Sequence, residues 1–131
     1  MATDERGTSD ISTTTETGLE PNVAGAVAYL FGFVSGIAML LIDGDNEFVR
    51  FHAIQSIAFN VVVVAVYVAL AFVSLFLSFL PVVGDLLSLL FTLVYPVVGF
   101  VAFAGWLFLM YRAYEGDRFE LPVLGSIAAS Q

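Results

Sequence analysis

Three long apolar runs limit the fold of this chain more than any other feature of its sequence. They cover residues 22–42, 57–80 and 86–111, and none of them contains a charged side chain. A helix of about 20 apolar residues crosses a hydrocarbon core about 30 Å thick, so each run is long enough to span a membrane. The sequence therefore predicts an all-α integral membrane protein with three transmembrane helices.

The composition supports one membrane domain over residues 21–131. Hydrophobic residues make up 60% of the chain and charged residues only 12%, whereas about a quarter of a soluble domain is charged. Residues 1–20 are rich in Thr, Ser and acidic side chains, which is typical of a disordered tail. They lack the apolar core of a signal peptide, so we expect the first run to serve as an uncleaved anchor.

The charge balance excludes several partners. Twelve acidic residues face four arginines, lysine is absent, and the net charge is -8. Nucleic acids and anionic surfaces require clustered basic side chains, so the lipid bilayer is the expected partner and nucleic acid is not. An acidic, lysine-free composition is also halophile-like. The absence of cysteine excludes disulfides and thiolate sites.

A polar segment, residues 48–56, comes directly before the second run and contains His52, the only histidine. A helix over residues 46–80 would be about 52 Å long, so its first ten residues would extend beyond the hydrocarbon core. At about 100° per residue, the polar side chains share one face except for Arg50, which points to the far side. The candidate functional polar residues are Arg50, His52, Gln55, Ser56 and Asn60.

Two interpretations of this polar face remain open. Polar side chains at membrane depth usually face a bundle interior or water, so the face is a candidate lining for an aqueous vestibule. Alternatively, the same side chains hydrogen-bond neighbouring helices and have a structural role. Catalysis is not expected, because the chain offers His52 no second histidine, thiol or intramembrane carboxylate. We therefore predict no catalytic, metal or cofactor site.

Four small or helix-breaking residues are candidates for helix packing. Gly32 and Gly36 form a Gly-x-x-x-Gly pattern that lets another helix approach closely. That helix is either the second or third span of the same chain or one from another copy. Pro96 removes a backbone donor inside the third run, next to Gly99, and predicts a kink. After the third run, residues 119–127 predict a short interfacial segment.

The arginines predict the orientation in the cell membrane. With three spans, the first loop and the C-terminal tail share one side, which holds Arg50, Arg112 and Arg118. The N-terminal side has only Arg6, among acidic residues. Positive residues favour the cytoplasmic side, so the C-terminus is expected in the cytoplasm and the N-terminus outside.

The segment Phe48-Val49-Arg50-Phe51-His52-Ala53-Ile54-Gln55-Ser56, between a first and a second span, resembles the signature of the Tic-twenty-like family. These are small prokaryotic membrane proteins of unknown function, related to a component of the chloroplast inner-envelope import translocon. The likeness covers residues 22 to about 128. It implies an all-helical membrane protein with a place in polypeptide translocation, and it brings no catalytic residue.

Two functional hypotheses follow. The first is a non-enzymatic, oligomeric membrane protein whose polar face at the cytoplasmic side belongs to a transport or protein-translocation path. The second is a structural or assembly factor that binds another membrane protein through the small-residue face at Gly32 and Gly36. In the first, the polar face lines a helix interface or an aqueous vestibule.

Overall fold

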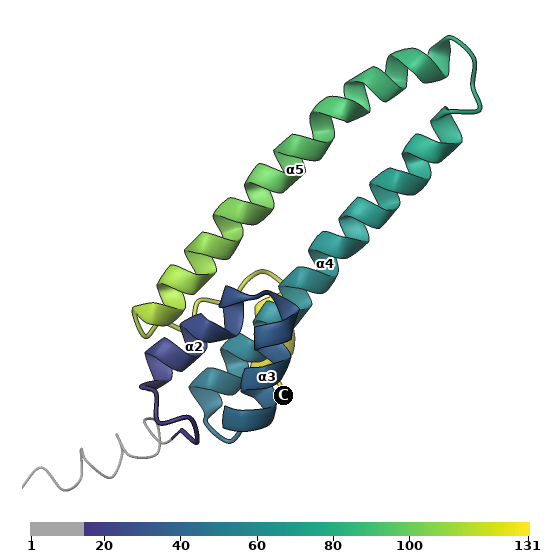
Figure 1. Cartoon of the computed structure of the whole chain (residues 1–131). Helices are drawn as coiled ribbons and strands as arrows, with labels where there is room; N and C mark the ends of the chain where they lie inside the picture. Colours follow the sequence, from purple (N-terminus) through teal and green to yellow (C-terminus); the bar gives the residue numbers. More distant parts are fainter. Residues whose placement is uncertain (1–14) are drawn as a thin grey trace, which may run out of the picture. The chain divides into compact units, whose positions relative to one another are not determined.

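The computed structural model describes residues 15–131, and this part of the chain forms five helices. Residues 1–14 of the predicted tail lie outside the described residues. The helices run in the order α2 to α6 (Figure 1), and their bounds are α2 Pro21–Leu30, α3 Phe33–Asp43, α4 Glu47–Leu77, α5 Val83–Tyr114 and α6 Leu124–Ala129.

The prediction of three spanning helices was wrong for the first apolar run. This run is divided into α2 and α3, with 10 and 11 residues, which pack against each other. Each is about 15–17 Å long, roughly half of a hydrocarbon core. The break lies at Gly32, whose φ of 63° and ψ of -137° suit glycine but not other residues. Apolar length alone does not reveal such a break.

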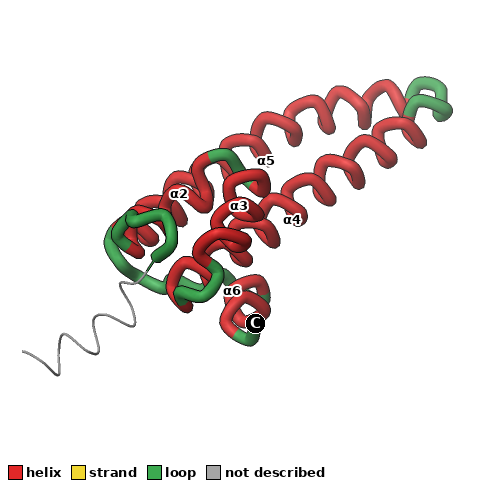
Figure 2. The backbone as a smooth tube through the Cα atoms, turned by 60° about the horizontal axis from the view of Figure 1, so that its bottom comes forward, coloured by secondary structure: helices red, strands yellow, loops and turns green. Residues whose placement is uncertain are grey.

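Within residues 15–131, two helices are long and apolar enough to cross a membrane, α4 with 31 residues and α5 with 32. Compared with the predicted span 57–80, α4 begins earlier, at Glu47, and ends earlier, at Leu77. Compared with the predicted span 86–111, α5 is longer at both ends. A short loop, shown in green in Figure 2, joins the two helices. The chain divides into two compact units, one holding the described residues up to Asn60 with Leu107–Gln131, the other holding Val61–Trp106.

In the unit Val61–Trp106, the two long helices meet through tyrosines. The hydroxyl of Tyr67 donates to the carbonyl of Tyr95 at 3.1 Å, and the hydroxyl of Tyr95 lies 3.2 Å from that of Ser74. A side chain at Gly99 would come within 3.0 Å of the Tyr67 hydroxyl. Pro96 therefore lies beside a polar contact inside the continuous helix α5, and the kink at this residue stays a prediction.

We expect Tyr67→Phe to weaken this helix pair modestly. It removes the hydrogen bond to Tyr95 while preserving the ring, and such bonds in membrane proteins contribute about 0.6 kcal/mol and up to about 1.7 kcal/mol. Unfolding of the purified protein by titration with a denaturing detergent measures the loss. Tyr111→Phe, which alters an exposed tyrosine, is the matched control. Equal midpoints for the two variants would contradict the prediction.

The unit that holds the described residues up to Asn60 and Leu107–Gln131 has a small core of mostly short side chains. Ala24 and Ala28 of α2 and Met39 of α3 cluster with Val49 and Ala53 of α4. Short side chains let the helix backbones approach closely. Within the predicted interfacial segment 119–127, α6 begins only at Leu124 and then continues to Ala129, and its Gly125 and Ala128 are buried. This unit positions the polar residues of α4.

Candidate functional site

The polar face of α4 is buried inside the unit that holds the described residues up to Asn60 together with Leu107–Gln131. His52, Gln55 and Ser56 are each 0% exposed, although their stretch of helix leads into an apolar span. Buried polar atoms are costly unless they find hydrogen-bond partners. The partners of these three side chains therefore define what the face does.

His52 joins two segments that are distant in sequence. Its Nδ1 lies 2.8 Å from the hydroxyl of Tyr29 on α2. Its Nε2 lies 2.9 Å from the backbone carbonyl of Asp117, just after α5. The rings of Phe48 and Phe51 meet the imidazole edge-on. Both ring nitrogens are thus engaged and the ring is enclosed by aromatic carbon.

Gln55 makes three hydrogen bonds, two of them to the C-terminal segment. Its amide nitrogen donates to the carbonyl of Phe119 at 2.9 Å and to the hydroxyl of Tyr29 at 3.0 Å. Its amide oxygen accepts from the backbone N–H of Leu121 at 2.9 Å. The side chain thereby pairs with an extended backbone as a neighbouring strand would, and it fixes residues 119–121 against α4.

The partners determine the direction of each hydrogen bond. A carbonyl only accepts, so Nε2 of His52 carries a proton and donates to Asp117. The Tyr29 oxygen already accepts from Gln55, which leaves its hydrogen to donate to Nδ1 of His52. This assignment makes His52 a neutral imidazole and leaves no two donors facing each other.

Ser56 and Asn60 continue the same face toward the apolar part of α4. The hydroxyl of Ser56 donates to the carbonyl of Gly32 at 3.3 Å. The amide of Asn60 donates to the carbonyl of Ser56, one turn earlier on the same helix. Its Oδ1 lies against Gly32, where a Cβ atom would approach it to 3.0 Å. These two residues therefore meet the break between α2 and α3.

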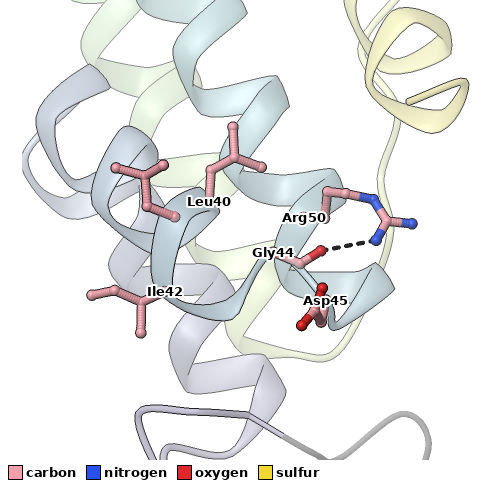
Figure 3. Close-up of a pocket in the computed structure, with 6 residues that line it drawn as sticks. Leu40, Ile42, Gly44, Asp45 and Arg50 are labelled. Atoms are coloured by element: carbon pink, nitrogen blue, oxygen red, sulfur yellow. Dashed lines mark hydrogen bonds between the residues drawn. The ribbon is translucent and has the colours of Figure 1, made fainter.

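Arg50 lies apart from this cluster. Its Nη1 donates to the carbonyl of Gly44 at 2.8 Å, and the side chain borders an open hollow of about 310 Å³ (Figure 3). Nη2 is 3.9 Å from the carboxylate of Glu47, one turn away. Arg50 therefore closes the loop between α3 and α4. The hollow is lined by Leu40, Leu41, Ile42, Gly44, Asp45 and Arg50.

The predicted packing glycines contact α4 of the same chain. A Cβ atom at Gly36 would lie 3.0 Å from the side chain of Ile57 and 3.2 Å from the carbonyl of Ala53. Gly25, which belongs to the same small-residue face of the sequence, faces Phe48 in the same way. The small-residue face is thus covered by the chain itself.

Several residues of this site were not predicted from the sequence. Tyr29 is the hydroxyl that links His52 to Gln55, and it sits within an apolar run whose polar content is otherwise low. The Tyr29 hydroxyl was a usable signal, because a buried tyrosine normally finds a hydrogen-bond partner. The contacts of Asp117, Phe119 and Leu121 use backbone atoms, which carry no signal in side-chain type.

A second set of hydrogen bonds holds the segment before α2. The buried carboxylate of Asp43, at the end of α3, accepts from the backbone N–H groups of Glu16 and Thr17 and from the Thr17 hydroxyl. Asn22 donates to the carbonyl of Tyr114 at 2.9 Å. The segments before α2 and after α5 are therefore both held by this unit.

Within residues 15–131, every buried side-chain nitrogen and oxygen has a hydrogen-bond partner. Charged groups near the cluster are also engaged. Arg112 pairs with Asp117, and the guanidinium of Arg118 lies 4.7 Å from the ring centroid of Phe51. Over the same residues, no group of three or more His, Cys, Asp or Glu is placed to hold a metal ion. The polar cluster is thus a closed network that joins α2, α4 and the C-terminal segment.

We expect Tyr29→Phe to destabilise the fold by about 1–3 kcal/mol, the usual cost of a buried polar group that loses its partner. The substitution withdraws the hydroxyl from both His52 and Gln55 while the ring still fills its site. The shift of the thermal unfolding midpoint in detergent measures the loss. Tyr114→Phe is the control, because that tyrosine is exposed. A midpoint as high as that of the control would show that the hydroxyl adds little.

The profile of the magnetosome magnetite crystal formation protein family matches residues 18–128 of this chain. A UPF0132 membrane protein of Archaeoglobus fulgidus is 40% identical over 113 residues, which cover 86% of this chain and 96% of that protein. A UPF0132 membrane protein of Methanocaldococcus jannaschii is 40% identical over 114 residues, covering 87% and 90%. No solved structure matches the chain.

These matches correct the resemblance drawn from the segment Phe48–Ser56. The assignment to the Tic-twenty-like family was wrong, because the matching profile belongs to another family and the relatives are UPF0132 membrane proteins. A motif of nine residues at the start of an apolar helix is less discriminating than a match along the chain. The relatives support a membrane protein, and the halophile-like interpretation stays a prediction.

Proposed function

This chain belongs to the magnetosome magnetite crystal formation protein family, and we propose that it acts as a non-enzymatic structural protein of the cell membrane. In this proposal it crosses the membrane more than once and associates there with another membrane protein. The family description concerns magnetite crystals. What we carry to this chain is the membrane setting, which its UPF0132 relatives share.

The closed polar network carries this proposal. His52 and Gln55 use their hydrogen-bonding atoms on Tyr29 and on the backbone of the C-terminal segment. A transport path or a catalytic site needs such groups free to meet a substrate. In this chain they fasten the fold, which favours a structural role over transport or translocation.

The surface offered to a partner is the apolar surface of the unit Val61–Trp106. The glycine face at Gly32 and Gly36 is covered by α4, so it is not the surface that we propose. By contrast, large side chains along the two long helices are strongly exposed, among them Phe72 at 68% and Phe100 at 75%. In a bilayer such a surface contacts acyl chains or the apolar surface of another protein.

Photo-crosslinking in living cells tests the proposal. A photoreactive phenylalanine analogue at Phe72 or Phe100 changes the size of an exposed side chain little, so the fold is preserved. The same analogue at Phe119, which is half-buried and packs against Phe108, serves as a matched control position. Adducts are identified by mass spectrometry after irradiation.

We expect one or two discrete protein adducts from the exposed positions and none from Phe119. Lipid adducts alone at both exposed positions would overturn the structural-partner proposal. A broad smear of many polypeptides would instead favour the translocation hypothesis.

A further inference from the structure

We propose that α2 and α3 form a re-entrant hairpin, which enters the bilayer and returns to the side from which it came. Its tip is the break at Phe31 and Gly32. In this proposal the hairpin contacts lipid acyl chains on one side and α4 on the other. This proposal is independent of the structural role proposed above, since it concerns how the first apolar run meets the membrane.

The backbone at the tip is satisfied in the way that membrane depth demands. Unpaired backbone groups in hydrocarbon cost several kcal/mol, so non-helical segments occur there only where protein groups satisfy them. The Ser35 hydroxyl accepts from the N–H of Phe31 at 2.9 Å and lies within hydrogen-bond distance of the carbonyls of Ala28 and Gly32. Ser56 of α4 donates to Gly32 as well.

The contacts with α4 place the tip at depth. Gly32 meets Asn60, while Arg50 closes the loop at the polar end of the same helix. Asn60 comes ten positions after Arg50, which is a rise of about 15 Å along an α-helix and about half of a hydrocarbon core 30 Å thick. The lengths of α2 and α3 agree with this depth.

The side of the tip that faces away from α4 is apolar. Phe31 is 71% exposed, and the other large side chains nearby, Leu30, Phe33 and Val34, are also exposed. The polar groups at the break, from Ser35, Ser56 and Asn60, lie on its protein side. Because the exposed surface of the tip consists of large apolar side chains, acyl chains are the occupant that fits it.

This arrangement changes the predicted topology. With α4 and α5 as the only full spans in residues 15–131, the segment before α2 and the segment after α5 lie on the same side. That side holds Arg50, Arg112 and Arg118, whereas the loop 78–82 between the long helices has no basic residue. Positive residues favour the cytoplasmic side, so we infer that both termini are cytoplasmic.

Labelling of single cysteines in the full-length protein tests the hairpin. The chain has no cysteine of its own, so each introduced thiol is unique. Glu20→Cys, Asp45→Cys and Pro81→Cys replace exposed residues, and a membrane-impermeant maleimide is applied to intact cells or to inverted vesicles. We expect positions 20 and 45 to be labelled only in inverted vesicles and position 81 only in intact cells.

A nitroxide at Phe31→Cys then measures depth by its collisions with oxygen, which concentrates in the bilayer, and with a water-soluble nickel complex. We expect at least a fivefold excess of oxygen over nickel collisions relative to the same label at position 45. Labelling of positions 20 and 45 from opposite sides would overturn the hairpin in favour of a spanning segment. Labelling of positions 20 and 45 from the same side, together with a water-accessible label at position 31, would overturn the hairpin in favour of a segment on the membrane surface.

Discussion

Replacing Gln55 with leucine should lower the free energy of unfolding by about 3 kcal/mol, because one buried and two part-buried groups lose their partner and each costs about 1–3 kcal/mol. Those groups are the carbonyl of Phe119, the N–H of Leu121 and the hydroxyl of Tyr29. Leucine nearly matches glutamine in volume, so the loss reports hydrogen bonding more than packing. Detergent-induced unfolding followed by circular dichroism measures it.

The same substitution should release the C-terminal segment before the rest of the protein unfolds. Arg118 lies between Asp117 and Phe119, whose carbonyls His52 and Gln55 hold, so its peptide bond should become accessible to trypsin. Gln131→Leu makes the same chemical change at an exposed position and is the matched control. Cleavage and unfolding equal to those of the control would refute the role that we assign to Gln55.

Gly32→Leu should have a comparably large effect at the break between α2 and α3. The backbone conformation of Gly32 suits glycine alone, and a residue held in such a region costs about 1–3 kcal/mol. The new Cβ atom would also press on Asn60, and overpacking costs about 1–3 kcal/mol more. We therefore expect a total loss of about 2–6 kcal/mol, measured by the same unfolding titration.

Two control variants separate backbone strain from crowding at Gly32. Gly116 also has a positive φ, of 81°, but no atom lies within 4 Å of the position of its Cβ. Gly116→Leu should therefore show the strain alone and lose less stability. Combining Gly32→Leu with Asn60→Ala should recover part of the loss through relief of the contact. Equal losses at both glycines, without recovery in the double variant, would rule out crowding against Asn60.

The structure changes the interpretation of two features of the sequence, the polar face of α4 and the first apolar run. Periodicity grouped His52, Gln55 and Ser56 on one face of α4, and all three are buried in one network. Their partners lie about 25 and 65 residues away, and most are backbone atoms, which a pattern of side chains does not reveal. The open vestibule and the internal cross-link were therefore equally compatible with the sequence.

The first apolar run shows a related limit. Hydropathy measures whether residues 22–42 prefer lipid, and α2 and α3 retain that apolar character. It does not measure whether the backbone turns within the run. Gly32 permits a turn, yet glycine is common in continuous transmembrane helices. The hydroxyls of Ser35 and Ser56 stabilise the turn, and Ser56 comes from another helix.

The sequence by itself determined that the chain is helical and apolar and that the runs 57–80 and 86–111 are long enough to cross a membrane, because these properties depend on local composition and length. The tertiary structure alone decided that the first run folds back at Gly32 and that Gln55 holds the C-terminal segment. Both depend on hydrogen bonds between segments that are distant in sequence. The free energy of those bonds exists only once the partners have been brought together.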